Sequence, residues 1–441
     1  EGGMTAEERF WWAARAPLVT SPSSAVGVES AVPETGRFSV ETLDDVRKIH
    51  GVVALHLRDG RFSEAVGVLA ASLLPALASG GLSGGGGTDG DGALRLSLAG
   101  MTLRNIGTIQ LWAGSYERAA DSFGRAAADS SAVGNGSTEG GTFDETSSLN
   151  LRGLSMFSLE KYSDANKSFL KSLAIMQRHR EREQAQSVED RQRPHKFAAG
   201  KTLNNVSCAF FEMGYYKSAC RALHRSLLVY MSDDLECGYP NLVFDAGRED
   251  LPEGKFPSLT DIMNGLKTRE MEIDHVPLEF ELDVAITFAN LAYLLVKRKK
   301  FSAAAVCLAE AASLQKRVFG HDHSIRLSTM ESLAFVNIKM HRYDRALRVF
   351  EDMLRLEENK IATSNLYHLT IAKLLGNMSY VYLKMRKLSA ALACLRGVIA
   401  NQEASLPPGD ESIEQTRNFM ADIEAQLRNE QDGGGSQDAA E

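Results

Sequence analysis

The chain has 441 residues, of which 44% are hydrophobic and 11 are proline, and its formal net charge is −8. The scarcity of proline favours helices over sheets, and the acidic balance argues against bulk nucleic-acid binding, which needs a basic surface. No apolar run approaches the ~20 residues that span a bilayer, so we expect no membrane insertion.

The cysteines indicate a reducing compartment, because their number is odd and no CxxC pair occurs. They are Cys208, Cys220, Cys237, Cys307 and Cys394. Four of the five fall in apolar helical segments, where cysteine acts as a small hydrophobe. We therefore expect an intracellular protein, with the cytoplasm as the favoured compartment. The chain begins at Glu1 rather than Met, so organelle targeting by a missing N-terminal segment stays open.

The first half of the chain reads as a leader followed by helix pairs. Residues 1–40 are rich in Ser, Pro and Gly and are expected to be largely disordered. Residues 41–230 hold four copies of one pattern, in which two short amphipathic helices flank a tight turn. Gly-rich stretches near 79–93 and 130–146 are predicted to be loops, because glycine is costly in a helix.

The second half repeats the pattern after an interruption. Residues 231–282 contain several prolines and are predicted to be an insert or a linker. Residues 283–402 hold copies five to seven, and 409–430 form one amphipathic helix that would cap the last apolar face. Residues 431–441 are expected to be a disordered tail.

Each copy carries an alanine in its second helix, usually three residues after an aromatic or apolar residue. These anchor alanines are Ala65, Ala119, Ala165, Ala219, Ala304, Ala346 and Ala391. A small side chain is needed where two helices approach closely, and a period near 42 residues is typical of stacked repeats. The sequence therefore predicts an all-α fold, a right-handed α-solenoid of about seven helix pairs with a C-terminal capping helix.

This pattern resembles the tetratricopeptide repeat, in the long-period form found in kinesin light chains. The segment LQKRVFGHDHSIRLSTMESLA, Leu314–Ala334, is similar to the linker of those repeats, and TLNNV and FANLA match the start of their first helices. The resemblance implies that the first helices line a concave groove that binds a protein partner.

An asparagine recurs in this groove fourteen residues before four of the anchors, as Asn105, Asn205, Asn290 and Asn377. A carboxamide offers both a donor and an acceptor, so such a row can match the N–H and C=O groups of an extended peptide. The alternative is that these side chains bond to neighbouring repeats or are ordinary polar residues.

In the last three copies the same stripe continues with an aromatic residue and a lysine. The sets are Asn290, Tyr293 and Lys297; Ser332, Phe335 and Lys339; and Asn377, Tyr380 and Lys384. Spacing of i, i+3 and i+7 places each set on one helix face. The stacked faces suit an extended peptide with acidic or aromatic residues. Alternatively, the aromatics pack between repeats and the lysines are simply solvated.

Other motifs point to no chemistry. Lys297–Lys300 spells KRKK, which resembles a short nuclear-localisation signal but sits at a helix turn, where solvated charge is normal. The cluster His321-Asp322-His323 fits the repeat linker better than a metal site, so we expect no metal and no cofactor. We also find no nucleophile–base pair and no paired carboxylates, so we expect no enzyme.

We therefore predict a scaffold or adaptor that binds a protein partner in the groove. One alternative is an architectural subunit of a larger complex that uses the convex face and the insert. A less favoured alternative is the regulatory repeat domain of an enzyme.

Overall fold

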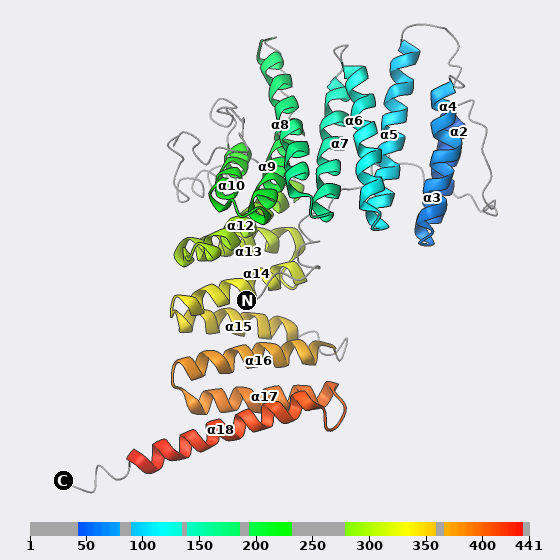
Figure 1. Ribbon diagram of the computed structural model, residues 1–441. Helices are drawn as coiled ribbons and strands as arrows, with labels where there is room; N and C mark the ends of the chain where they lie inside the picture. The colour runs from blue at the N-terminus through cyan, green and yellow to red at the C-terminus, as the bar shows by residue number, and fades with distance from the viewer. Residues whose placement is uncertain are drawn as a thin grey trace. The chain divides into compact units, whose positions relative to one another are not determined.

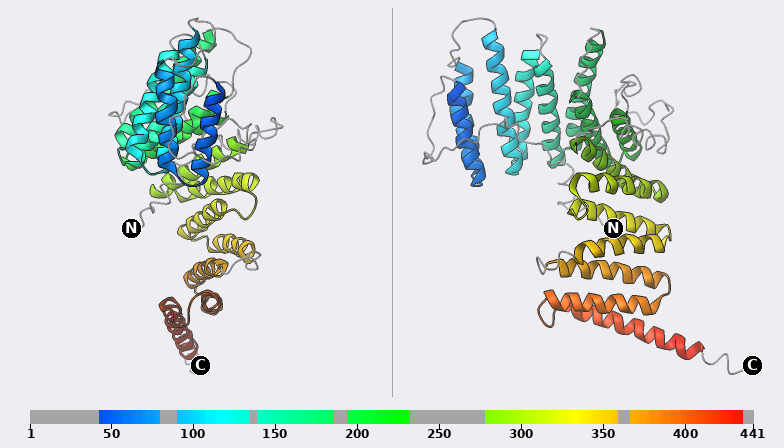
Figure 2. Two further views of the ribbon diagram at one scale, coloured as in Figure 1. Left: turned by 90° about the vertical axis from the view of Figure 1, so that its right-hand side faces the viewer. Right: turned by 180° about the vertical axis from the view of Figure 1, so that it is seen from behind.

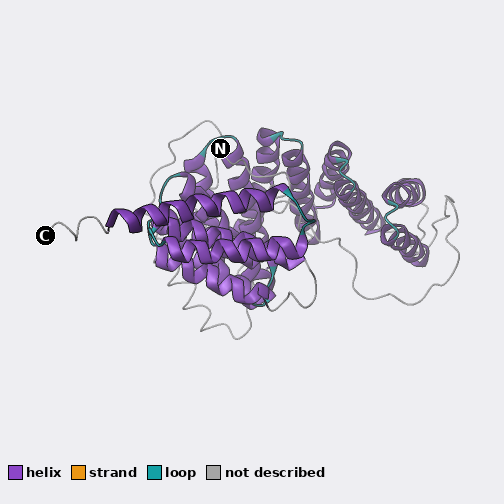
Figure 3. Ribbon diagram, turned by 90° about the horizontal axis from the view of Figure 1, so that it is seen from below, coloured by secondary structure: helices purple, strands orange, loops and turns teal. Residues whose placement is uncertain are grey.

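The computed structural model describes residues 43–79, 90–134, 139–185, 194–231, 278–358 and 366–434. Every regular element in these residues is helical (Figure 1, Figure 3). The predicted leader, most of the predicted insert and the end of the predicted tail lie outside the described residues. The chain divides into an N-terminal unit, Glu1–Gly265, and a C-terminal unit, Leu266–Glu441.

The N-terminal unit contains four helix pairs in its described residues. Their elements are α2 (Leu43–Arg58), α3 (Phe62–Val68), the π-helix η1 (Leu69–Leu73), α4 (Leu74–Ser79), α5 (Gly90–Trp112), α6 (Tyr116–Gly134), α7 (Glu139–Ser158), α8 (Tyr162–Ala185), α9 (Pro194–Glu212) and α10 (Tyr216–Met231). The segments α3, η1 and α4 form one continuous helix with a single π-helical stretch, because Leu69 and Leu74 both keep helical backbone angles.

The C-terminal unit contains three helix pairs and a last single helix in its described residues (Figure 2). Its elements are α12 (Leu278–Lys297), α13 (Phe301–Phe319), α14 (Ser324–Lys339), α15 (Tyr343–Glu358), α16 (Leu366–Lys384), α17 (Leu388–Ser405) and α18 (Glu411–Gly434). Helix α18 packs against α17 through Ile423, Leu392 and Leu395, and so covers the apolar side of the last pair.

The anchor alanines lie where the sequence pattern placed them. All seven are 0% exposed, which confirms the predicted all-α stack of helix pairs. In the N-terminal unit the close approach also requires glycine. A Cβ atom at Gly107 or Gly153 would lie 2.7 Å or 2.3 Å from the ring of Phe123 or Phe169, respectively.

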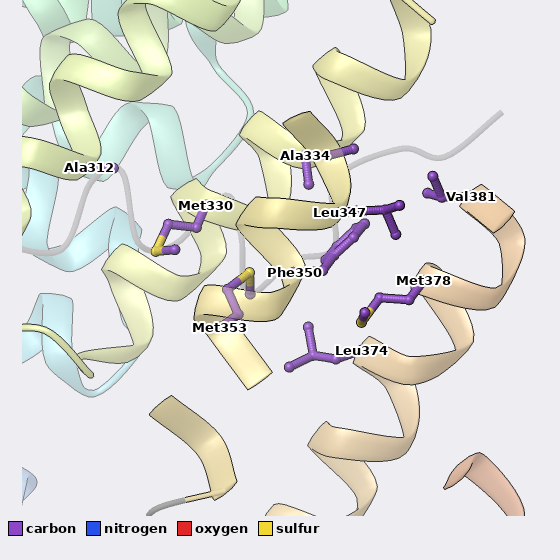
Figure 4. Close-up of a cluster of buried hydrophobic side chains, with 10 residues drawn as sticks. Ala312, Met330, Ala334, Leu347, Phe350, Met353, Leu374, Met378 and Val381 are labelled. Atoms are coloured by element: carbon purple, nitrogen blue, oxygen red, sulfur yellow. The ribbon is translucent and has the colours of Figure 1, made fainter. Parts of the chain in front are cut away.

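The core of the C-terminal unit is continuous across several helices. Figure 4 shows one cluster in which Met330 of α14, Phe350 and Met353 of α15, and Leu374 and Met378 of α16 point toward one another. The ring of Phe350 is 2% exposed and lies among them. Each helix therefore buries its apolar stripe against the preceding and the following helix, as expected for a repeat stack.

The first and second helices of each pair are joined by the same tight turn. In the first turn the N–H of Gly60 donates to the carbonyl of Leu57, and the N–H of Arg61 donates to that of His56. This Schellman pattern requires a left-handed residue just after the helix. That residue is Gly60, Gly114, Glu160 or Gly214 in the N-terminal unit and Lys299, His341 or Arg386 in the C-terminal unit.

Several helices extend into stretches whose composition predicted loops. Helix α5 begins at Gly90, α6 runs to Gly134 and α7 begins at Glu139, while α18 continues to Gly434 in the predicted tail. Extending an existing helix adds one hydrogen bond for each residue that is fixed, whereas starting a new helix is costly. Residues at the edges of both predicted loops and of the predicted tail are therefore helical.

Candidate functional site

Three lysine–aromatic pairs follow one another on the first helices of the C-terminal unit. The ammonium nitrogen of Lys297 lies 5.4 Å from the ring centroid of Tyr293 on α12. The equivalent distances are 5.1 Å for Lys339 and Phe335 on α14, and 5.3 Å for Lys384 and Tyr380 on α16. We call these six residues the first-helix face. Each pair is spaced by four residues, so the helix itself holds the cation over the ring.

Two of these rings are exposed to solvent. Phe335 is 47% exposed and Tyr380 is 50% exposed, whereas Tyr293 is partly buried. All three lysines are exposed. Large apolar rings on a surface are favourable contacts for a partner, because their burial removes apolar area from water. The face therefore offers two rings and three cations that the packing of the repeats does not consume.

An ion pair joins the faces of α14 and α16. The ammonium nitrogen of Lys373 lies 2.8 Å from a carboxylate oxygen of Glu331. The two side chains border a cleft of about 590 Å³ whose lining also includes Leu327, Ser328 and Thr370. Because Glu331 precedes Phe335 by four residues, this cleft adjoins the exposed ring along the same helix face.

The four predicted asparagines differ in exposure. Asn290 is 4% exposed, and Asn105, Asn205 and Asn377 are partly buried. In the middle copy the equivalent residue is Ser332, which is exposed and donates to the carbonyl of Ser328 at 3.0 Å. Burial of Asn290 favours the alternative in which the amide belongs to the packing of the repeats.

Polar side chains that the repeat pattern did not indicate form contacts between helices of the N-terminal unit. The Asn150 amide on α7 donates to Thr202 on α9 at 2.7 Å and to Ser172 on α8 at 3.1 Å. The guanidinium of Arg104 on α5 lies 2.6 Å from a carboxylate oxygen of Asp144 on α7. The contacts Asn150–Thr202 and Arg104–Asp144 each join two successive helix pairs, so only the stacked fold brings their partners together.

The corresponding positions of the N-terminal unit carry different chemistry. Seven residues before the anchor, where the C-terminal unit has lysines, stand Arg58, Trp112, Ser158 and Glu212. Eleven residues before the anchor, where it has aromatics, stand Ala54, Thr108, Leu154 and Cys208. The lysine–aromatic ladder is therefore a property of the C-terminal unit, although Asn105 and Asn205 extend the asparagine pattern into both units.

Two partly buried thiols are poor nucleophiles near neutral pH. Burial raises the pKa of Cys208 to about 12, and the nearby Glu212 carboxylate adds to the shift. Burial also raises the pKa of Cys394. Both groups therefore stay protonated near pH 7, in the form that does not attack electrophiles or bind metals.

Within the described ranges, no group of three or more His, Cys, Asp or Glu side chains is placed to hold a metal ion. No helix of the described residues is both long enough and apolar enough to cross a membrane.

A family comparison matches part of the C-terminal unit. Residues 283–359 match the tetratricopeptide repeat family. This segment is similar to a tetratricopeptide repeat array. It spans α12 to α15 and thus contains the first two lysine–aromatic pairs. No curated protein matches the chain in a sequence comparison.

Solved tetratricopeptide repeat proteins are among the structures similar to this chain. BtubC (BKLC) from P. vanneervenii is 15% identical, with a TM-score of 0.43 over 67% of this chain and 95% of that chain. The C-terminal part of a repeat-containing protein from Cytophaga hutchinsonii is 9% identical, with a TM-score of 0.45 over 82% of this chain and 97% of that chain.

Proposed function

We propose that this protein is a protein–protein interaction scaffold whose first-helix face binds an extended peptide segment of a partner. The observation that carries the proposal is the ladder of three lysine–aromatic pairs on α12, α14 and α16. Successive first helices present the same two groups, so a peptide that crosses the helices meets an aromatic and a cation at each repeat.

The chemistry of the face defines the class of segment. Phe335 and Tyr380 favour bulky apolar or aromatic side chains, since burying such rings against each other is favourable beyond the area removed from water. The exposed lysines favour carboxylates beside those anchors. The partner segment is therefore expected to alternate aromatic or large apolar residues with Asp or Glu.

The asparagines have a reduced role in this proposal. Asn290 is buried, so it is a positioning residue for α12 rather than a peptide contact. Asn377 is partly exposed and lies three residues before Tyr380, so it can meet the peptide backbone at the last pair. The first-helix face thus binds mainly through rings and cations.

A random-peptide display library panned on the full chain tests the proposal. We expect enrichment of sequences that combine acidic and aromatic residues. Substituting Phe335→Ser together with Tyr380→Ser should weaken a selected peptide by about tenfold or more, because truncating an anchor residue typically costs more than 1 kcal/mol. Circular dichroism should stay unchanged, since both rings are exposed.

The matched control is Trp112→Ser, which removes a ring of similar exposure (43%) from the N-terminal unit. This variant should bind the selected peptide like the unmodified chain. If the peptide binds the Phe335→Ser, Tyr380→Ser variant as tightly as the unmodified chain, or if panning enriches no peptide, the first-helix face is not the binding site.

A cleft in the N-terminal unit supports the alternative of an architectural subunit. It has a volume of about 380 Å³ and an apolar lining that includes Val66, Ala70 and Leu74, with Arg118 and Asp121 among its charged residues. Its lining combines residues of α3, η1, α4, α5 and α6, so a second protein could bind here without using the first-helix face. A complex that survives the Phe335→Ser, Tyr380→Ser substitution would favour this alternative.

A further inference from the structure

The turns between first and second helices carry a concentration of positive charge in the C-terminal unit. They are the segments 297–300, 339–342 and 384–387. Their lysines and arginines are Lys297, Arg298, Lys299, Lys300, Lys339, Arg342, Lys384, Arg386 and Lys387, all of them exposed. We call this set the turn edge. No acidic residue occurs in the three segments.

The three turns lie along one side of the C-terminal unit. Helices of a pair run antiparallel, so every first-to-second turn falls on the same side of the stack, as Figure 1 shows for the turns between α12 and α13, α14 and α15, and α16 and α17. The linkers from one pair to the next lie on the opposite side. The nine cations therefore lie in one strip along a single side of the C-terminal unit.

The cations of the turn edge are not neutralised within the described part of the chain. None of the nine forms an ion pair there, and three of them lie over their own aromatic rings. On the opposite side the pattern is reversed. Arg317 pairs with Glu281 at 3.2 Å, and Arg417 pairs with Glu403 at 2.6 Å. Within the described residues, the turn side therefore carries nine unpaired cations, whereas Arg317 and Arg417 on the opposite side are ion-paired.

Several of these cations occupy positions where another residue type would be more stable. Lys299 and Arg386 have φ of 58° and 56°, in the left-handed region that glycine adopts at little cost. Lys300 and Lys387 stand at the N-caps of α13 and α17, and their side chains make no capping hydrogen bond. Cations are unfavourable at a helix N-terminus, where serine or aspartate would stabilise the helix.

We infer that the turn edge is a docking surface for an acidic polypeptide segment of the partner. Local rules that are broken repeatedly without a structural gain are expected at functional sites. Three cations of the strip, Lys297, Lys339 and Lys384, also belong to the first-helix face, where they favour carboxylates. The inference thus rests on the proposed function for the partner class, a protein, and adds a second contact surface with its own charge requirement.

The surroundings of the strip favour a polypeptide over a nucleic acid. Single-stranded nucleic acids bind by stacking bases on free aromatic faces. Phe301 and Tyr343, which begin the second helices, are partly buried, and each ring of the first-helix face has a lysine ammonium over one side.

The test variant removes positive charge at positions where glycine or serine should stabilise the fold. The variant combines Lys299→Gly, Lys300→Ser, Arg386→Gly and Lys387→Ser. Its melting temperature should equal or exceed that of the unmodified chain, because glycine suits the left-handed positions and serine suits the N-caps. Binding is measured on the full chain by fluorescence anisotropy with labelled poly-glutamate at low and high salt.

We expect the unmodified chain to bind poly-glutamate in a salt-sensitive manner and the variant to bind about tenfold more weakly. The control removes the same amount of charge from the second helices, with Lys316→Ser, Arg348→Ser, Arg355→Ser and Arg396→Ser, of which Arg355 and Arg396 pair with Asp352 and Glu424. This control should retain most of the binding. Equal weakening of both variants would overturn the assignment to the turn edge, as would unchanged binding by the turn variant.

Two further measurements separate the possible failures. Poly-uridylate RNA and phosphatidylserine vesicles are tested in parallel, and tighter binding of either than of poly-glutamate would overturn the choice of an acidic polypeptide. The Phe335→Ser, Tyr380→Ser variant should keep poly-glutamate binding while losing the display-selected peptide. If poly-glutamate binds at the turn edge and no display-selected peptide binds the first-helix face, the proposed function fails while the turn edge stands.

Discussion

The two units share one packing frame, which consists of the anchor alanines and the turns that join each helix pair, but they expose different surfaces. Both are held by anchor alanines that are 0% exposed, and both turn from first to second helix through the same pair of backbone hydrogen bonds. At the turns, the N-terminal unit places glycine at three of four left-handed positions, whereas the C-terminal unit places Lys299, His341 and Arg386. The packing frame therefore does not fix the residue type at these positions, so their side chains can differ between the units without changing the fold.

Charge at the turns differs in the same way. In the N-terminal unit Arg61 pairs with Asp59 at 2.8 Å, and Lys161 pairs with Glu117 at 3.4 Å. In the described part of the C-terminal unit the turn cations have no carboxylate partner. An exposed ion pair contributes little to stability, so the difference concerns what each surface attracts rather than how well each unit folds.

The largest expected effects test whether the packing frame is truly shared. The substitutions Phe350→Ala in the C-terminal unit and Phe169→Ala in the N-terminal unit should each lower the free energy of unfolding by about 3–5 kcal/mol, because both rings are buried. Chemical denaturation followed by circular dichroism measures both losses. A loss below about 1 kcal/mol in either variant would show that the two frames are not equivalent.

A glycine substitution tests the closer helix approach of the N-terminal unit. Gly153→Ala should destabilise by about 1–3 kcal/mol, because the added Cβ atom would lie 2.3 Å from the Phe169 ring. Gly51→Ala is the control, since nothing lies within 4 Å of its added Cβ atom. This control should stabilise by about 0.5–1 kcal/mol. Equal effects of the two substitutions would contradict the packing described for Gly153.

Exchanging glycine and arginine between the left-handed turn positions of the two units tests whether these positions are equivalent. Gly114→Arg should destabilise the N-terminal unit by about 1 kcal/mol, because arginine is strained at the φ of 73° found there. Arg386→Gly should leave the C-terminal unit unchanged or slightly stabilise it, since φ is 56° at that position. Thermal unfolding of each variant is the measurement. If both substitutions shift the melting temperature in the same direction, the charged residues at these turns are not kept at the expense of stability.

The smallest expected effect concerns the lysine–aromatic pairs. Lys339→Met should lower the free energy of unfolding by about 0.5–1 kcal/mol at most, because an exposed cation–π contact is weak. Its effect on binding an acidic display-selected peptide should be larger than its effect on stability. Anisotropy and denaturation measured on the same preparation compare the two. A large stability loss would assign Lys339 a structural role instead.

The repeat pattern was predictable because packing acts on local, periodic features. The spacing from Ala304 to Ala346 and the aromatic residue before each anchor were enough to place the helix pairs. The helix ends at Gly90 and Gly434 were not, because cooperative extension overrides the composition of a few residues.

The candidate site was predictable only where its residues share one helix. The pairs Tyr293–Lys297 and Tyr380–Lys384 follow from four-residue spacing. The burial of Asn290 and the ion pair between Glu331 and Lys373 depend on how successive pairs stack, which the spacing within one helix does not report. The left-handed lysine and arginine turns were hidden because glycine marked the equivalent turns elsewhere in the chain.

Photo-crosslinking of a display-selected peptide to the full chain tests the central claim most directly. The peptide carries a benzophenone in place of one aromatic residue, and mass spectrometry maps the adducts. We expect adducts on α14 and α16, near Phe335 and Tyr380. Adducts confined to α5, α7 and α9 of the N-terminal unit, or to the outer surfaces of the second helices, would contradict it.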